Sequence, residues 1–309
     1  MSRMRSLGLA GTLLIATTAT AACGAGNAAT GDGKPAVMAA FYPLQWISQQ
    51  VGGADVSVTG LTKPGTEPHD LELTARQVAD IKDSSLVVYI KGVQPALDEA
   101  VDGHASGKAF DAAAAVSTIP ATGDDEGHGE QGHADHADPT YDPHVWLDPS
   151  RFATVATQLG ERLAGVDPAH AAAYKQRAAT TASALTALDG EYRKGLTTCA
   201  GRAIVTSHSA FGYLADRYGL EQISVSGIDP ETEPSPTRLA EVADIARQKN
   251  VTTIFTEELV SPKVAEILAK EVGAKTAVLN PIESAPGDGD YLSEARRNLE
   301  TLRTALGCS

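Results

Sequence analysis

The chain has 309 residues, which is enough for one large domain or for two domains of ordinary size. Apolar residues make up 42% and charged residues 21% of the sequence, as in a globular protein with an adequate core. A formal net charge of −14 argues against nucleic acid and against an anionic membrane surface as partners. This acidity fits a cationic ligand, and it fits equally well an ordinary solvated acidic surface.

Residues 1–22 have the pattern of a bacterial signal peptide, with a short basic region followed by an apolar stretch. That stretch is too short for a membrane span and ends in two alanines before Cys23. The ending resembles a lipoprotein lipobox, except that Thr20 stands where an aliphatic residue is usual. Cleavage before Cys23 would leave a lipidated tether over residues 23–35, and an ordinary signal peptidase site nearby is the alternative.

Alternating strand and helix patterns predict an α/β lobe over residues 36–165. Strands are expected at residues 36–41, 56–61 and 85–90, and helices after Tyr42, at 74–82 and from 97. The unbroken apolar run in the third strand is typical of a buried parallel strand. This lobe includes a loop over residues 121–141 that is rich in Gly, Asp, Glu and His.

A long linking helix is predicted over residues 166–198, where helix-forming residues dominate. Asp167 is placed to cap this helix, and Pro168 fits its first position. About 30 residues at 1.5 Å per residue would make a rod of roughly 45 Å, long enough to run the length of two lobes.

The α/β alternation resumes over residues 199–309, which predicts a second lobe. Strands are expected at 203–206, 222–225, 251–255 and 276–279, and helices at 210–218, 237–249, 262–272 and 291–306. The expected fold class is therefore α/β, with two lobes of mainly parallel sheet joined by one long helix. A ligand would bind in the cleft between the lobes.

The cysteines suggest a disulfide in the second lobe. With Cys23 consumed by lipid, Cys199 and Cys308 remain as an even pair in an oxidising compartment. We expect them to form a bond that closes this lobe, and two buried free thiols are the alternative.

Three histidines, His69, His144 and His208, lie in loops that follow predicted strands or the acidic loop. Ligands of parallel α/β sheets bind beyond the carboxyl ends of the strands, so these positions face a common cleft. One histidine in a loop is more often structural, but three converging imidazoles suit zinc. The sequence therefore predicts a metal site.

The motifs around these histidines, at residues 65–72, 142–149 and 207–214, resemble those of the metal-binding solute receptors of ABC transporters. The resemblance is to the zinc and manganese receptors with a rigid linking helix, and it covers the chain from Val37 to the last predicted helix. It implies a receptor that captures Zn²⁺ outside the cytoplasm and delivers it to a membrane permease, and not an enzyme.

The resemblance also implies a set of ligands. His69, His144 and His208 match three metal ligands, and the fourth is a carboxylate after the strand at 276–279. We expect Glu283 in that role, with the amide oxygen of Asn280 or a water as the alternative. Manganese receptors of this kind tend to have Glu where this chain has His208, so the ligand set favours zinc over manganese.

The acidic and histidine-rich loop is expected to gather zinc at weak auxiliary sites, without entering the main site. Its candidate residues are Asp124, Asp125, Glu126, His128, His133, Asp135 and His136. A solvated insert with no metal role is the alternative.

Other residues near the motifs have supporting roles in this interpretation. Trp146 and Phe211 are expected to pack against the histidines that they neighbour. The candidate acceptors for imidazole N–H groups are Asp70, Asp148, Glu257 and Glu258.

The expected setting is the outer face of the bacterial cytoplasmic membrane, or the periplasm, for a monomer held by its lipid anchor. Its partners would be the permease and, to load it, a zinc metallochaperone; nucleic acid is excluded. Two alternatives remain at this point, a manganese receptor of the same family and a zinc hydrolase that uses three histidines. No HExxH helix or Ser/His/Asp arrangement supports the hydrolase.

Overall fold

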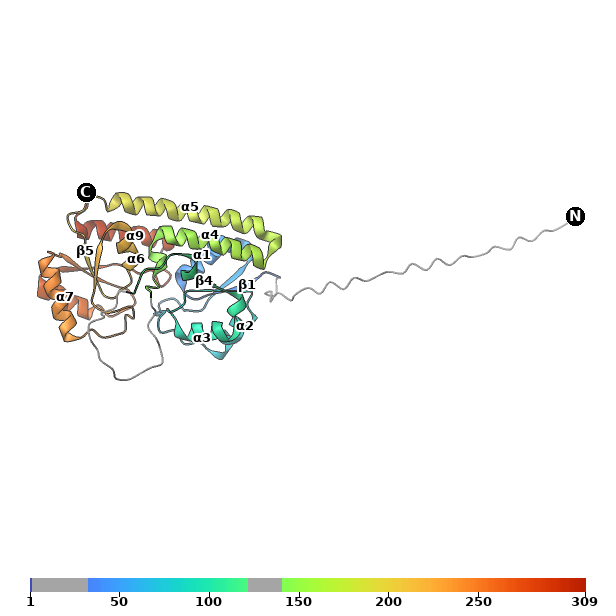
Figure 1. Ribbon diagram of the computed structural model, residues 1–309, viewed down its shortest axis with the longest axis horizontal. Helices are drawn as coiled ribbons and strands as arrows, with labels where there is room; N and C mark the ends of the chain where they lie inside the picture. The colour runs from blue at the N-terminus through green and yellow to red at the C-terminus, as the bar shows by residue number, and fades with distance from the viewer. Residues whose placement is uncertain (2–32, 122–140) are drawn as a thin grey trace.

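The structure is a computed structural model that describes Met1 and residues 33–121 and 141–309. It has two α/β lobes, and a pair of long helices, α4 (Pro149–Val166) and α5 (Ala171–Gly195), lies across them (Figure 1). The predicted signal peptide, Cys23 and almost all of the tether fall outside the described residues. The predicted fold class is confirmed.

The N-terminal lobe is built on one parallel sheet with the strand order β2-β1-β3-β4. Its strands are β1 (Ala36–Ala39), β2 (Ser57–Gly60), β3 (Leu86–Tyr89) and β4 (Ala109–Asp111). Its helices are α1 (Tyr42–Gly52), α2 (Ala75–Asp83) and α3 (Pro95–His104). Every residue of β3 is buried, as the apolar run predicted, whereas the short β4 was not predicted.

The C-terminal lobe repeats this plan with the strand order β6-β5-β7-β8, again all parallel. Its strands are β5 (Ala203–Thr206), β6 (Glu221–Ser224), β7 (Thr253–Thr256) and β8 (Lys275–Val278). Its helices are α6 (Gly212–Tyr218), α7 (Pro236–Gln248), α8 (Lys263–Val272) and α9 (Tyr291–Leu306). Both lobes therefore share one sheet topology.

The linking helix is shorter than predicted and has a helical neighbour that the sequence analysis missed. α5 has 25 residues and begins at Ala171, so it is about 37 Å long. Asp167 does not cap it: a separate short 3-10 turn at Pro168–His170 intervenes, and the Asp167 carboxylate accepts from the Tyr174 hydroxyl instead. The missed helix, α4, begins at Pro149.

α5 is fixed to both lobes by buried polar contacts. On the N-terminal side, the Arg177 guanidinium donates to the carbonyl oxygens of Val51 and Gly52 at 2.9 and 2.7 Å. On the C-terminal side, the Tyr192 hydroxyl donates to the carbonyl oxygen of Ala295. Because both ends of one rigid helix are anchored, the relative position of the two sheets is tied to it.

Asp189 makes the densest of these contacts. Its carboxylate accepts from Arg217 at 2.9 and 3.0 Å, from Arg193 at 3.0 Å and from the Tyr218 hydroxyl at 3.1 Å. Burial raises the pKa of Asp189, but the hydrogen bonds from Arg217 and Arg193 outweigh it and hold the pKa below its usual value. The linking helix is therefore joined to α6 by an ionised carboxylate.

The predicted disulfide between Cys199 and Cys308 is present. It links residues 109 positions apart and joins the end of the linking segment to the second residue after α9. The two cysteines also form an isolated antiparallel bridge, so the bond ties the start of the C-terminal lobe to its end.

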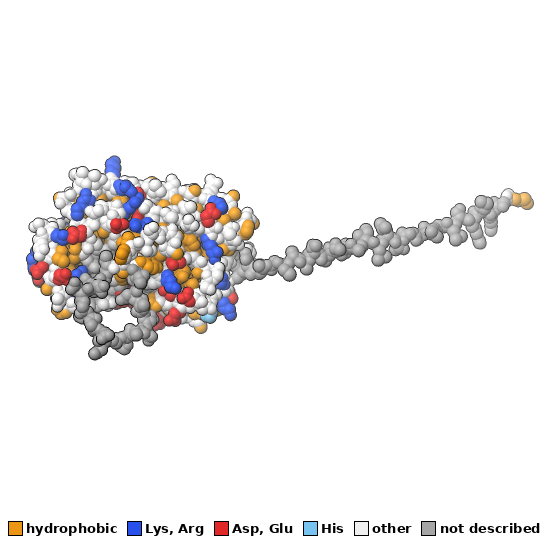
Figure 2. All heavy atoms as spheres, viewed as in Figure 1, with side chains coloured by type: hydrophobic (Ala, Val, Ile, Leu, Met, Phe, Trp, Pro, Cys, Tyr) orange, Lys and Arg blue, Asp and Glu red, His pale blue; other side chains and the backbone are white. Residues whose placement is uncertain are grey.

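The surface shows no sign of a basic binding face in the view of Figure 2, where Lys, Arg, Asp and Glu side chains are interspersed. Across residues 33–121 and 141–309, no helix has the length and apolar character that a bilayer crossing requires.

We predict that Asp189→Asn lowers the free energy of unfolding by about 2–3 kcal/mol at neutral pH, because a charged acceptor of four hydrogen bonds is lost. Since the pKa of Asp189 is lowered in the folded state, its stabilising effect is complete at neutral pH and is lost as the pH falls below 3.8. Urea unfolding at pH 7 and pH 3 measures both effects.

The matched control is Glu191→Gln, two residues further along the same helix. Glu191 also pairs with an arginine, Arg296, at 2.8 Å, but both side chains are more than 40% exposed. This variant should change stability by less than about 1 kcal/mol. Equal losses in the two variants would contradict the role assigned to Asp189.

We also predict that replacing both Cys199 and Cys308 with serine lowers the free energy of unfolding by about 2–5 kcal/mol, because the unfolded chain regains the freedom of a closed loop. The comparison is between the oxidised wild type and the double variant in urea, with the reduced wild type as control. A reduced wild type as stable as the oxidised protein would contradict this prediction.

Candidate metal centre

The structure brings together all four residues that the sequence analysis selected as ligands. His69 lies in the loop between β2 and α2, His144 lies just before the short turn Val145–Leu147, and His208 follows β5. Glu283 lies in the loop after β8. One donor atom from each lies within 4.8 Å of the others, so residues far apart in the sequence form one cluster between the lobes.

The Glu283 carboxylate is almost equidistant from the three rings. Its Oε1 atom lies 3.8 Å from Nε2 of His69, 3.8 Å from Nε2 of His144 and 3.9 Å from Nε2 of His208. Four donors around a tetrahedral zinc ion, each about 2.0–2.1 Å from it, would be separated by about 3.4 Å. The three distances from Glu283 to the imidazoles are therefore within about half an ångström of those in a zinc coordination sphere.

The donor atoms of this cluster accept no hydrogen bond from any described residue. His144 and His208 are fully buried, and Glu283 is 2% exposed. Among the described residues, Nε2 of each of the three histidines and both carboxylate oxygens of Glu283 are buried without a hydrogen bond. Such groups are costly to bury, and a cation that accepts all their lone pairs offsets that cost.

Two carboxylates behind the rings fix which nitrogen faces the centre. Oδ1 of Asp142 lies 2.8 Å from Nδ1 of His144, and Oε2 of Glu257 lies 2.7 Å from Nδ1 of His208. The hydrogen bond from Asp142 places the ring proton of His144 on Nδ1 and leaves its Nε2 lone pair for a metal, and the Glu257 carboxylate pairs with the Nδ1 side of the His208 ring.

These acceptors were only partly predicted. Glu257 was expected, whereas Asp70 and Glu258 are exposed, and Asp148 caps α4 by accepting from the backbone of Ser150. Asp142 was missed although it precedes His144 by two residues. That spacing, which lets a carboxylate reach the backbone and ring of the same histidine, is a local signal that could have identified it.

The electrostatics of the cluster favour a cation. Burial raises the pKa of Glu283, but the three imidazoles outweigh it and keep the pKa below its usual value, so the carboxylate is charged. Burial lowers the pKa of His144 in spite of Asp142. For His208, burial also lowers the pKa, but Glu257 outweighs it and raises the pKa to about 9. A cation that binds at neutral pH therefore displaces a proton from His208.

Glu67, two residues before His69, is a further buried carboxyl beside the cluster. Burial and the charge of Glu283 raise the pKa of Glu67 to about 8, which keeps it protonated at neutral pH. It therefore adds no second negative charge to the centre.

The side chain of the alternative fourth ligand, Asn280, makes hydrogen bonds to other residues of its own lobe. Its Oδ1 atom accepts from the backbone N–H of Ile282 at 2.7 Å, and its Nδ2 group donates to Glu294 on α9. In this conformation both polar groups of the Asn280 side chain are thus engaged within the protein.

Of the two predicted packing residues, Trp146 lies against its histidine as expected. Trp146 and Phe211 are fully buried, and the Trp146 ring lies 5.1 Å from the His144 ring.

The seven candidate residues of the acidic loop (Asp124, Asp125, Glu126, His128, His133, Asp135 and His136) lie outside the described residues. The ends of that loop are close together, because Pro120 and Tyr141 form an antiparallel bridge.

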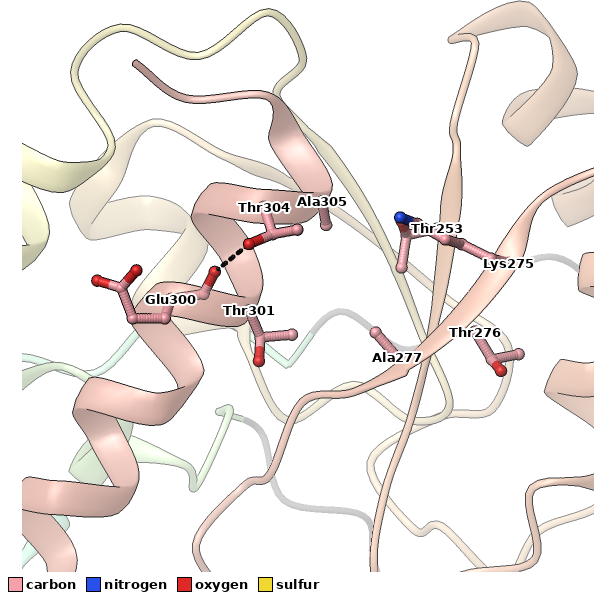
Figure 3. A pocket seen from close by; sticks show the side chains of 8 residues that line it. All are labelled: Thr253, Lys275, Thr276, Ala277, Glu300, Thr301, Thr304 and Ala305. Atoms are coloured by element: carbon pink, nitrogen blue, oxygen red, sulfur yellow. Dashed lines mark hydrogen bonds between the residues drawn. The ribbon is translucent and has the colours of Figure 1, made fainter.

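A separate pocket lies at the opposite end of the C-terminal sheet, between α9 and strands β7 and β8 (Figure 3). Its walls include Thr253 and Lys275, the first residues of those strands. On the helix side, the Thr304 hydroxyl donates to the carbonyl oxygen of Glu300. This pocket has no histidine or cysteine and lies at the amino ends of the strands, so it is distinct from the metal centre.

Two α/β lobes joined by a long helix, with three imidazoles and one carboxylate converging between them, define a metal-binding solute receptor. The model of the periplasmic zinc-uptake complex component A (ZnuA) family matches residues 37–305. The chain belongs to this family.

The relatives of this chain agree with that assignment. It is 35% identical over 298 residues to the zinc-binding lipoprotein AdcA of Streptococcus pneumoniae, covering 90% of this chain and 57% of that protein. The chain thus spans little more than half the length of this curated relative.

Two solved structures of relatives match over nearly their whole length. The laminin-binding protein Lmb of Streptococcus agalactiae is 33% identical with a TM-score of 0.78, covering 88% of this chain and 99% of that one. A Zn(II)-bound variant of AdcAII of Streptococcus pneumoniae is 29% identical with a TM-score of 0.77, covering 88% of this chain and 98% of that one.

Proposed function

We propose that this protein is a zinc receptor that binds one Zn²⁺ through His69, His144, His208 and Glu283 and delivers it to the permease of an ABC transporter. The observation that carries this proposal is the convergence of four buried donors that have no other partner among the described residues. The zinc named for the relatives AdcA and AdcAII supports the choice of metal.

The ligand set favours zinc over manganese. Three imidazoles and one carboxylate suit a borderline ion with a four-coordinate preference, whereas manganese prefers more oxygen ligands. Copper and nickel bind nitrogen ligands at least as tightly in solution, so selectivity in the cell depends partly on which metal is supplied.

The geometry favours a receptor over a hydrolase. A catalytic zinc ion keeps one coordination position for water beside three protein ligands. Here Oε1 of Glu283 lies within 3.9 Å of all three Nε2 atoms and occupies the fourth position. A cluster closed by four protein donors stores a metal and offers no position for a substrate.

The cellular setting that we propose rests on the sequence. Acylation of Cys23 would anchor a monomer outside the cytoplasmic membrane, within reach of the permease, and a zinc metallochaperone could load it. The lipoprotein relative AdcA supports the anchor.

We predict that Glu283→Ala lowers the zinc affinity by on the order of 100-fold or more, because the only charged donor of the cluster is lost. Competition with a chromophoric chelator measures the affinity, and elemental analysis after mixed exposure to zinc and manganese identifies the metal retained.

The matched control is Glu258→Ala, which removes an exposed carboxylate beside Glu257 in the same lobe. Its zinc affinity should stay within about twofold of the wild type. A Glu283→Ala protein that binds zinc as tightly as the wild type would rule out Glu283 as a ligand and favour an open three-histidine site.

We predict that deleting residues 122–138 lowers the number of zinc ions bound but leaves one tight site. The bridge between Pro120 and Tyr141 holds the two ends of the loop together, so a short Gly-Ser linker can replace the deleted residues. Isothermal titration calorimetry gives both stoichiometry and affinity.

A loop of natural length with His128, His133 and His136 changed to serine is the control for length. It should lose the same weak sites as the deletion. Loss of the tight site in either variant would contradict an auxiliary role for the loop.

A further inference from the structure

The segment that carries Glu283 contains an unusual backbone conformation. Ile282 has a φ angle of +62°, and the only other described non-glycine residue with a positive φ is Asn250. A β-branched residue is disfavoured in the left-handed region because its Cβ crowds the backbone. Ile282 is 1% exposed, so its side chain is fixed in the core while its backbone is strained.

Asn280 holds this turn in place. Its Oδ1 atom accepts from the Ile282 backbone N–H at 2.7 Å, which closes the turn immediately before Glu283. Its own backbone is anchored on α9, where Asn298 accepts from the Asn280 N–H at 2.9 Å and donates to the Asn280 carbonyl oxygen at 2.6 Å. Asn280 therefore connects α9 to the strained residue Ile282.

The other lobe contacts the same segment on both sides of the strained residue. The Trp146 indole N–H donates to the carbonyl oxygen of Pro281 at 2.7 Å, and Trp146 lies two residues from His144. The Gly65 N–H donates to the Ser284 hydroxyl at 2.8 Å from the loop that carries His69. The turn is thus built against the segments that present two of the histidines.

We propose that Asn280 is a positioning residue for metal binding. It keeps Ile282 in the left-handed conformation that directs the Glu283 carboxylate to a point equidistant from the three imidazoles. Without the bond from Asn280, Ile282 can relax to a negative φ, which rotates the following residue and withdraws its carboxylate. This inference rests on the proposed role of Glu283 as a ligand.

The first test is Asn280→Ala. We expect a 10- to 100-fold loss of zinc affinity, as for residues that orient metal ligands, together with faster zinc release to a chelator. The visible absorption of bound Co²⁺ should also change, because the carboxylate no longer sits in its tetrahedral position. A role limited to stability would leave the Co²⁺ spectrum unchanged.

A double-mutant cycle with Glu283→Ala separates positioning from general damage. If Asn280 acts through Glu283, Asn280→Ala should weaken zinc binding by less than about threefold in the Glu283→Ala background. Losses of equal size in both backgrounds would overturn the proposal.

A second cycle tests the strain. Glycine adopts a positive φ without crowding, so Asn280→Ala should weaken zinc binding less in an Ile282→Gly background than in the wild type. An undiminished loss would overturn the part of the proposal that assigns strain to Ile282.

The matched control is Asn250→Ala. Asn250 is the other described non-glycine residue with a positive φ, and it lies beyond the end of α7. Its zinc affinity should stay within about twofold of the wild type. If Asn280→Ala does not fold by circular dichroism, Asn298→Ala removes the anchor of Asn280 and should weaken zinc binding in the same direction.

The outcomes distinguish the two proposals. A wild type that binds no zinc, or a Glu283→Ala variant that binds it normally, would refute the proposed function. Tight wild-type binding and weak Glu283→Ala binding, combined with unchanged binding by Asn280→Ala or its substitute Asn298→Ala, would refute only this inference.

Discussion

The constraint on which this structure depends is the burial of a charged carboxylate among three imidazoles. Glu283 is 2% exposed and makes no hydrogen bond within the described residues, so the three rings alone offset the cost of its desolvation in the absence of a cation. Removing one member of such a buried set of charged and polar groups costs more stability than replacing the whole set with apolar residues. The two lobes, the linking helix and the carboxylates behind the rings together keep these groups apart by a distance that a metal ion fills.

Much of this arrangement follows from short-range features of the sequence. The apolar run of β3 and the strand–helix alternation predict parallel sheets, and parallel sheets place loop residues such as His69 and His208 at one cleft. Glu283 could be selected only from the motif resemblance, because no spacing rule connects it to histidines more than seventy residues away. The long-range pairing of four ligands is a property of the fold and not of any one segment.

The errors have equally local causes. The sequence signal for α4 is the Asp148 N-cap followed by a Pro at the first helical position. The same residues belong to the motif around His144, which predicts a metal-binding loop. Asp167 was assigned as a cap because Asp-Pro often begins a helix, but its carboxylate is engaged by Tyr174. The positive φ of Ile282 has no sequence signal, since an isoleucine in that conformation is imposed by tertiary contacts.

The contacts of α5 and of the loop that carries Glu283 indicate which part of the structure can move when the metal binds or leaves. Arg177 anchors α5 to the N-terminal lobe, and Asp189 and Tyr192 anchor it to the C-terminal lobe, so rigid separation of the lobes would have to bend a 25-residue helix or break buried bonds. Residues 281–284 are held instead by single hydrogen bonds from Trp146 and Gly65 and by the turn at Asn280, which is itself anchored on α9 by Asn298. One backbone rotation at Ile282 would displace the only charged donor without bending the linking helix. Because Ile282 is strained, its turn keeps this conformation only through contacts with the neighbouring residues. A partner that contacts those residues can therefore act on the metal without separating the lobes.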